Sequence, residues 1–220
     1  VADWDTQRFL MSYRDLTDQA SNTSGVNRVA LIENGSVIEE DLISSTINTT
    51  ANASITNFSF SKTTLNTVYV ESAASNLATD FLELDTNGLK DIYELNLSSS
   101  TSKRISLSEG SEVTENVELI GSIETENSNE LVVFQTTSDA FSISDENDDL
   151  DIYVIDPSLS SKTISLISHD INGKAIGALR DQTLVTNDSI YFVSDANNIV
   201  ADEFNNKADI FKVLSSDMSM

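Results

Sequence analysis

An acidic turn that runs directly into an apolar strand occurs three times in the chain. The three copies, at residues 85–95, 145–155 and 202–213, read DTNGLKDIYEL, DENDDLDIYVI and DEFNNKADIFKV. They recur at intervals of roughly 60 residues, and self-similarity at such a period indicates a fold built from copies of one small unit. The repeat therefore constrains the fold more tightly than any single motif does.

Short apolar segments around these turns are typical of β-strands. Four of them, which resemble one another as buried strands do, lie at 8–13, 67–72, 131–136 and 189–194. A second set follows across polar loops at 28–32, 91–95, 151–155 and 209–213, a third set lies at 36–42, 103–107 and 162–167, and a further strand precedes the later copies at 54–60, 117–123 and 175–179. Helix signals are almost absent, because Ser, Thr and Asn crowd the connections and favour turns.

Short strands repeated in this order predict an all-β fold. We expect a β-propeller or a part of one, with about four blades of four short antiparallel strands, and a β-sandwich array is the alternative. A single propeller-like domain would span residues 1–220, with repeats at approximately 1–47, 48–110, 111–170 and 171–220. The first copy starts at its second strand and the last stops soon after its third, so the two ends of a closed ring would share a blade. In an open arrangement the chain would be a piece of a larger one.

The composition fits a folded domain that avoids polyanionic partners. Of the 220 residues 39% are hydrophobic, enough for a core, whereas 12 Lys and Arg face 36 Asp and Glu, for a formal charge of -24. This charge repels nucleic-acid phosphates and anionic lipid head groups, so it argues against nucleic acid and favours cations as partners. No apolar run approaches the length of a membrane span, which predicts no membrane insertion. Residues 1–5 lack the features of a signal peptide and an initiator Met, as expected of a mature or excised form.

Asp and Asn residues at alternating positions of the acidic turns are the candidate metal ligands. They are Asp85, Asn87 and Asp91 in the first turn, Asp145, Asn147, Asp149 and Asp151 in the second, and Asp202, Asn205 and Asp209 in the third. A Ca²⁺ ion takes about six to eight oxygen ligands, which a tight Asp/Asn turn supplies from side chains and carbonyls, so calcium is the predicted cofactor. None of the turns has the Glu of an EF-hand loop. The alternative is that these side chains hydrogen-bond the backbone of their own turns without a metal.

The chain has little material for nucleophilic catalysis. It contains no Cys and one His, His169, and no Gly-x-Ser-x-Gly motif accompanies that histidine. Phosphate-binding loops and dinucleotide fingerprints are also absent from the sequence, and among 36 acidic residues no pair can be selected for glycoside hydrolysis. We therefore predict a protein that is not an enzyme, without catalytic or cofactor-binding residues other than the metal ligands above.

The repeat resembles a known family. Residues 68–80, 85–97 and 101–107 resemble the blade repeat of bacterial TolB-type, WD-repeat-like β-propellers, and in particular the variant with an Asp-x-Asn-Gly-x-x-Asp turn found in large secreted or surface proteins. The resemblance covers most of 58–213 and, weakly, 9–42. In the first copy Asn27 stands where the others have Asp, which departs from the pattern.

The resemblance bears on the fold more than on the function. The fourfold repeat, the acidic turns and the lack of nucleophilic residues predict a binding, adhesion or interaction module of a secreted or cell-surface bacterial protein, stabilised by calcium and acting on a protein or glycan partner. Two alternatives stay open: the non-catalytic propeller portion of a larger hydrolase, and a periplasmic scaffold similar to TolB itself.

Overall fold

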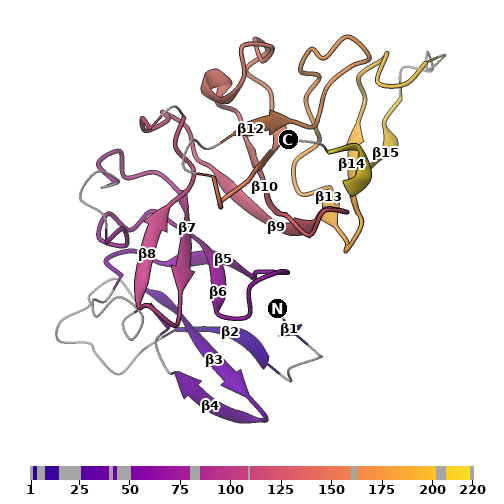
Figure 1. Cartoon of the computed structure of the whole chain (residues 1–220). Coiled ribbons are helices and arrows are strands. Elements are labelled where there is room, and N and C mark those ends of the chain that lie inside the picture. The colour runs from indigo at the N-terminus through magenta and orange to yellow at the C-terminus, as the bar shows by residue number, and fades with distance from the viewer. Residues whose placement is uncertain are drawn as a thin grey trace. The chain divides into compact units, whose positions relative to one another are not determined.

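The computed structural model of the chain is an all-β structure, which confirms the predicted class (Figure 1). It describes residues 2–3, 8–14, 26–39, 42–43, 51–79, 85–108, 110–159, 163–201 and 207–218. Within these ranges the strands form four antiparallel sheets, each a meander of strands that follow one another in sequence. The elements η2 (Asp139–Phe141) and η3 (Ser215–Asp217) are single turns of 3-10 helix. No helical segment in these ranges has the length and hydropathy of a membrane span.

The chain forms two compact units, Val1–Ser106 and Leu107–Met220. Unit 1 contains two sheets of four strands, with the order β1-β2-β3-β4 and β5-β6-β7-β8. Their bounds are β1 (Ala2–Asp3), β2 (Arg8–Arg14), β3 (Asn27–Glu33), β4 (Ser36–Glu39), β5 (Ile55–Phe60), β6 (Thr67–Ser72), β7 (Asp91–Asn96) and β8 (Thr101–Arg104). Apolar side chains of both sheets, such as Val29, Leu31, Val68 and Leu95, are buried in one core.

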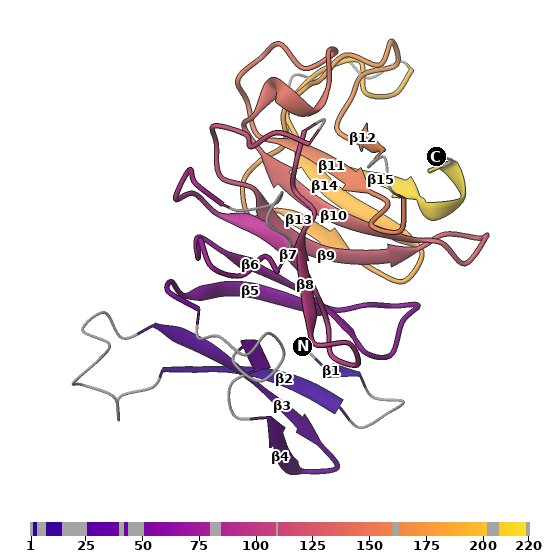
Figure 2. The same cartoon turned by 60° about the vertical axis from the view of Figure 1, so that its left-hand side comes forward.

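Unit 2 contains one sheet of four strands, ordered β9-β10-β11-β12, and one of three, ordered β13-β14-β15. Their bounds are β9 (Glu118–Glu124), β10 (Glu130–Thr136), β11 (Asp151–Ile155), β12 (Ile164–Leu166), β13 (Thr183–Val185), β14 (Ser189–Ser194) and β15 (Asp209–Leu214). Figure 2 shows β12, β11, β10 and β9 one below the other. Val133, Ile152 and Val154 from this sheet pack with Ile190 and Phe192 from the other, so the two sheets also share a core.

The acidic residues that open the repeated strands occupy one equivalent position in three sheets. Asp91, Asp151 and Asp209 each begin the third strand of their sheet. Each pairs with the last residue of the second strand, which is Ser72, Thr136 or Ser194 respectively. Each sheet also lies within one of the four predicted repeats. The repeat read from the sequence is therefore a structural unit.

The prediction of a strand at 175–179 is wrong. Only Ala175 makes a β-bridge there, to His169, and the first strand of the last sheet is β13. Gly177 has a φ of +71°, which takes the backbone out of the extended region. The backbone N–H groups of Ile176 and Ala178 instead donate to the carbonyls of Ser168 and Leu150, so this segment lies against the loops of the preceding sheet.

The start of the chain also differs from expectation. The first sheet begins with β1, because Ala2 and Asp3 pair with Phe9 and Arg8 of β2, whereas we expected it to start at its second strand. The last sheet has three strands among the described residues.

Candidate functional site

A buried acidic cluster lies where β7 begins. Asp91 is fully buried, and its Oδ2 accepts a hydrogen bond from Arg104 Nη1 at 3.0 Å. Its Oδ1 accepts one from the Ser106 hydroxyl at 2.5 Å, and the Ser106 oxygen in turn accepts the backbone N–H of Ile92 at 2.9 Å. We call Asp85, Asp91, Tyr93, Arg104 and Ser106 the second-repeat corner.

Asp85 joins this corner from the turn before β7. Its Oδ1 lies 3.8 Å from Arg104 Nη1 and accepts the backbone N–H of Asn87 at 3.1 Å, and its Oδ2 accepts from the Tyr93 hydroxyl at 3.3 Å. Burial raises the pKa of Asp91, while the hydrogen bond from Ser106 and the charge of Arg104 oppose the rise. One guanidinium therefore faces two buried carboxyl groups.

The same cluster recurs where β11 begins. The Tyr153 hydroxyl donates to Asp145 Oδ2, and the Ser168 hydroxyl donates to Asp151 Oδ1. The Ser168 oxygen accepts the backbone N–H of Ile152 at 2.8 Å, as Ser106 does for Ile92, and the Gly177 N–H adds a bond to Asp151 Oδ1 at 3.2 Å. We call Asp145, Asp151, Tyr153, Leu166 and Ser168 the third-repeat corner.

The two corners differ at the residue on the fourth strand. Arg104 stands opposite Tyr93 in the pairing of β7 with β8, and Leu166 stands opposite Tyr153 in the pairing of β11 with β12. Without that arginine, burial and the charge of Asp145 raise the pKa of Asp151 to about 6, although hydrogen bonds from Ser168 and Gly177 lower it. Burial also raises the pKa of Asp145.

The remaining candidate ligands close turns or lie elsewhere. Asn87 Oδ1 accepts the N–H of Leu89 at 2.7 Å, and Asn147 Oδ1 accepts the N–H of Asp149 at 2.8 Å, so both amides act as turn acceptors. Asp149 is exposed and Asp209 is half-buried. Asp202 and Asn205 lie outside the described residues.

No group of three or more His, Asp or Glu side chains in the described ranges is arranged to hold a metal ion. The structure thus brings Asp85 together with Asp91 and Asp145 together with Asp151, each with hydroxyl donors, and leaves the two Asn residues in turn roles. Calcium binding by the acidic turns stays a prediction.

The residues that complete the corners were not among the predicted ligands. They are Tyr93, Arg104 and Ser106 with their counterparts Tyr153, Leu166 and Ser168. A signal for them exists in the sequence. The tripeptide Asp-Ile-Tyr opens both strands at 91–93 and 151–153, and an Ile-Ser pair follows each of them at 105–106 and 167–168. The spacing alone is not sufficient, because a second Ile-Ser pair at 164–165 lies closer to Asp151 and the structure uses Ser168.

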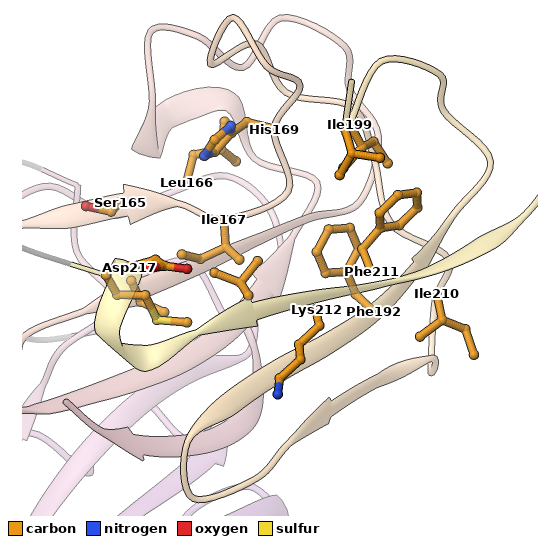
Figure 3. A pocket seen from close by; sticks show the side chains of 14 residues that line it. Ser165, Leu166, Ile167, His169, Phe192, Ile199, Ile210, Phe211, Lys212 and Asp217 are labelled. Atoms are coloured by element: carbon orange, nitrogen blue, oxygen red, sulfur yellow. The ribbon is translucent and has the colours of Figure 1, made fainter. Parts of the chain in front are cut away.

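A second candidate site is a cavity of about 650 Å³ in unit 2 (Figure 3). Its lining comes from β11, β12, β14, β15, η3 and the loops at 169 and 199–200. The rings of Phe192 and Phe211 lie side by side in it, with centroids 5.6 Å apart. His169 is exposed at its border, and its Nδ1 lies 2.8 Å from the Asp170 carbonyl oxygen. The lining is mainly apolar, which suits the binding of an apolar group more than bond-breaking chemistry.

The chain matches no protein-family model and none of the curated proteins compared with it.

Proposed function

We propose that the chain is a non-enzymatic protein-interaction module whose last sheet accepts an extended strand from a protein partner. The observation that carries this proposal is the cavity beside β15, on the side of the last sheet where the other three sheets have a fourth strand. In the proposal each sheet is one blade of a TolB-type propeller, and the family resemblance supports a secreted or cell-surface location.

The last sheet, which has three strands among the described residues, offers the backbone N–H and C=O groups of β15 to such a strand. In the other three sheets a fourth strand pairs with the third, as β8 does with β7 and β12 with β11. The third strand of the last sheet, β15, has β14 as its one neighbouring strand among the described residues. A strand at a sheet edge is a template for pairing with an extended segment of another chain.

The cavity supplies the side-chain part. It opens between β12, the fourth strand of one sheet, and β15, the third strand of the next (Figure 3). Ile210 of β15 is 76% exposed and Val200, which also lines the cavity, is 51% exposed, so apolar surface continues from the cavity to the outside. Alternate side chains of an added strand would fill this space, because successive residues of a strand point to opposite faces.

The net charge of the chain indicates the composition that a partner strand would have. The chain carries a formal charge of -24, so a strand with Lys or Arg among its apolar residues is favoured over an acidic one. The segment at 162–167, Lys-Thr-Ile-Ser-Leu-Ile, has this composition and contains the fourth strand of the third repeat. We therefore expect the partner to present an extended, basic segment with alternating apolar residues.

A labelled peptide with the sequence of residues 162–169 tests the proposal by fluorescence anisotropy. We expect saturable binding to the full chain, and no binding of the same peptide with Pro at its central Ser, because Pro cannot pair in a strand ladder. Ile210→Asp should weaken binding at least about tenfold. Ile143→Asp is the matched control, since Ile143 is 99% exposed and lies outside the cavity lining.

Two results would overturn the proposal. One is the absence of saturable binding, and the other is equal binding by the Ile210→Asp and Ile143→Asp variants. Sedimentation of the chain without peptide distinguishes a further occupant. A dimer that forms with increasing concentration and is lost in Ile210→Asp would assign the edge to a second copy of the chain instead of a partner.

A further inference from the structure

The two acidic corners use corresponding atoms in corresponding ways. Each has an Asp that opens the third strand, an Asp six positions earlier in the chain, a Tyr that donates to the earlier Asp, and a Ser that donates to the later one. Arg104 Nη1 contacts two oxygens of the second-repeat corner, Asp85 Oδ1 and Asp91 Oδ2. These two contacts have no equivalent in the third-repeat corner, because Leu166 stands at the matching register position.

In the third-repeat corner, which has no arginine, one oxygen of each carboxylate makes no hydrogen bond. Asp145 Oδ1 and Asp151 Oδ2 are buried and have no hydrogen bond, and they are the counterparts of the two oxygens that Arg104 contacts. Both residues are more than nine-tenths buried. The corner thus presents two buried carboxylate oxygens that make no hydrogen bond, and Asn147 is a polar group that acts on both carboxylates, lowering the pKa of each.

The charges around the third-repeat corner are negative. The carboxylates of Asp139 and Asp148 act on Asp145, and Asp145 acts on Asp151. Neither Asp145 nor Asp151 has an ion pair with a Lys or Arg in the part of the chain that the structure describes. Burying ionised carboxylates without a counter-charge is strongly unfavourable, so the corner favours a positively charged ligand.

We propose that Asp145 and Asp151 bind one hard divalent cation, which takes the place that the Arg104 guanidinium has in the second repeat. Ca²⁺ and Mg²⁺ both bind carboxylate, carbonyl and water oxygens, and Mg²⁺ in particular is bound through one or two carboxylates while it keeps several waters. The pair of carboxylates and their acidic neighbours match a double positive charge. The proposal does not depend on strand addition at β15, and it predicts no ion in the second-repeat corner.

Calcium or magnesium alone, added to the full chain in chelator-treated buffer with constant KCl, tests the site. Binding to the folded state stabilises it, so hydrogen exchange of the amides at 151–155 should slow at least about tenfold at saturating ion. The amides of the equivalent strand at 91–95 should exchange at an unchanged rate. This internal comparison separates the site from diffuse binding of cations to an acidic surface.

Three variants, one of them a control, give the decisive outcome. Leu166→Arg rebuilds the second-repeat corner in the third repeat, so we expect slow exchange at 151–155 without an added ion and no further response to one. Ile143→Arg adds the same charge at a fully exposed position outside the corner and should keep the response. If the Leu166→Arg variant does not fold, Asp151→Asn replaces it as the test. This smaller change should abolish the slowing of exchange by added ion.

Three outcomes would overturn the proposal. The first is no change in exchange at 151–155 with millimolar Ca²⁺ or Mg²⁺. The second is a response that survives in both Leu166→Arg and Asp151→Asn, which would assign the ion to other acidic residues. The third is equal protection by added NaCl, which would assign a monovalent ion in place of a divalent one.

Discussion

The second-repeat and third-repeat corners have the same hydrogen-bonded frame and a different charge balance. In both, a serine after the fourth strand accepts the backbone N–H of the residue that follows the buried Asp and donates to that Asp. Arg104 compensates the carboxylates in one, and Leu166 leaves them uncompensated in the other. The hydrogen bonds of the corner are therefore a property of the repeat. Whether the buried carboxylates have a counter-charge depends on the one side chain that faces the Tyr.

The largest effect is expected from Arg104→Leu, which gives the second-repeat corner the composition of the third. Asp85 and Asp91 would lose their buried counter-charge, so the free energy of unfolding should fall by about 3–5 kcal/mol. Urea unfolding in chelator-containing buffer, followed by circular dichroism, measures the change.

Lys103→Leu is the matched control for this variant. Lys103 neighbours Arg104 on β8 and forms a half-exposed ion pair with Glu94 at 3.2 Å, whose loss should cost at most about 1 kcal/mol. If both variants lose the same small amount, Arg104 does not compensate the corner and the contrast between the repeats disappears.

The strands were predictable from sequence because their residues leave few alternatives. The segments Thr67–Ser72 and Glu130–Thr136 are short, rich in β-branched and aromatic residues and bounded by polar turns, and both are buried throughout in the structure. The equivalence of Asp91, Asp151 and Asp209 followed from spacing alone, since a repeated unit places equal offsets at equal positions.

The contacts that define the candidate site were not predictable in the same way. The fourth strands share a Lys-x-Ile-Ser-Leu sequence at 103–107 and 162–166, which suggests matching registers. The pairings show otherwise, because Arg104 faces Tyr93 whereas Leu166, and not the residue after Lys162, faces Tyr153. The paired residues are 11 apart in the second repeat and 13 apart in the third, so the connection between the paired positions is two residues longer in the third repeat. The strand prediction for residues 175–179 failed for a related reason. Backbone hydrogen bonds to neighbouring loops outweighed the strand-like pattern of this segment.

The next prediction compares Asp91 and Asp151, because replacing each by Asn should change the free energy of unfolding in opposite directions. Asp91→Asn removes the close partner of a buried arginine and should lower the free energy of unfolding by about 3 kcal/mol. Asp151→Asn removes an uncompensated buried charge and keeps the Oδ1 acceptor for Ser168 and Gly177, so at pH 8 without divalent ions it should raise that energy by about 1 kcal/mol. Urea unfolding of the two variants side by side measures both. Equal losses would show that the charge balance of the corners is the same.

The last expected effect is a pH dependence that belongs to the third-repeat corner. Its basis is the pKa of Asp151, which burial raises from the ordinary 3.8 to about 6. The folded chain then binds a proton more tightly than the unfolded chain, so in chelator the free energy of unfolding should fall as pH rises from about 4 to about 6, by at most about 3 kcal/mol. The Asp151→Asn variant lacks the titrating group and its charge coupling to Asp145, and carboxylates outside the corner contribute equally to both proteins. The difference between the two unfolding energies should therefore change across this window and stay constant above it. Parallel curves would mean that Asp151 titrates normally and that its burial is compensated by a group outside the corner.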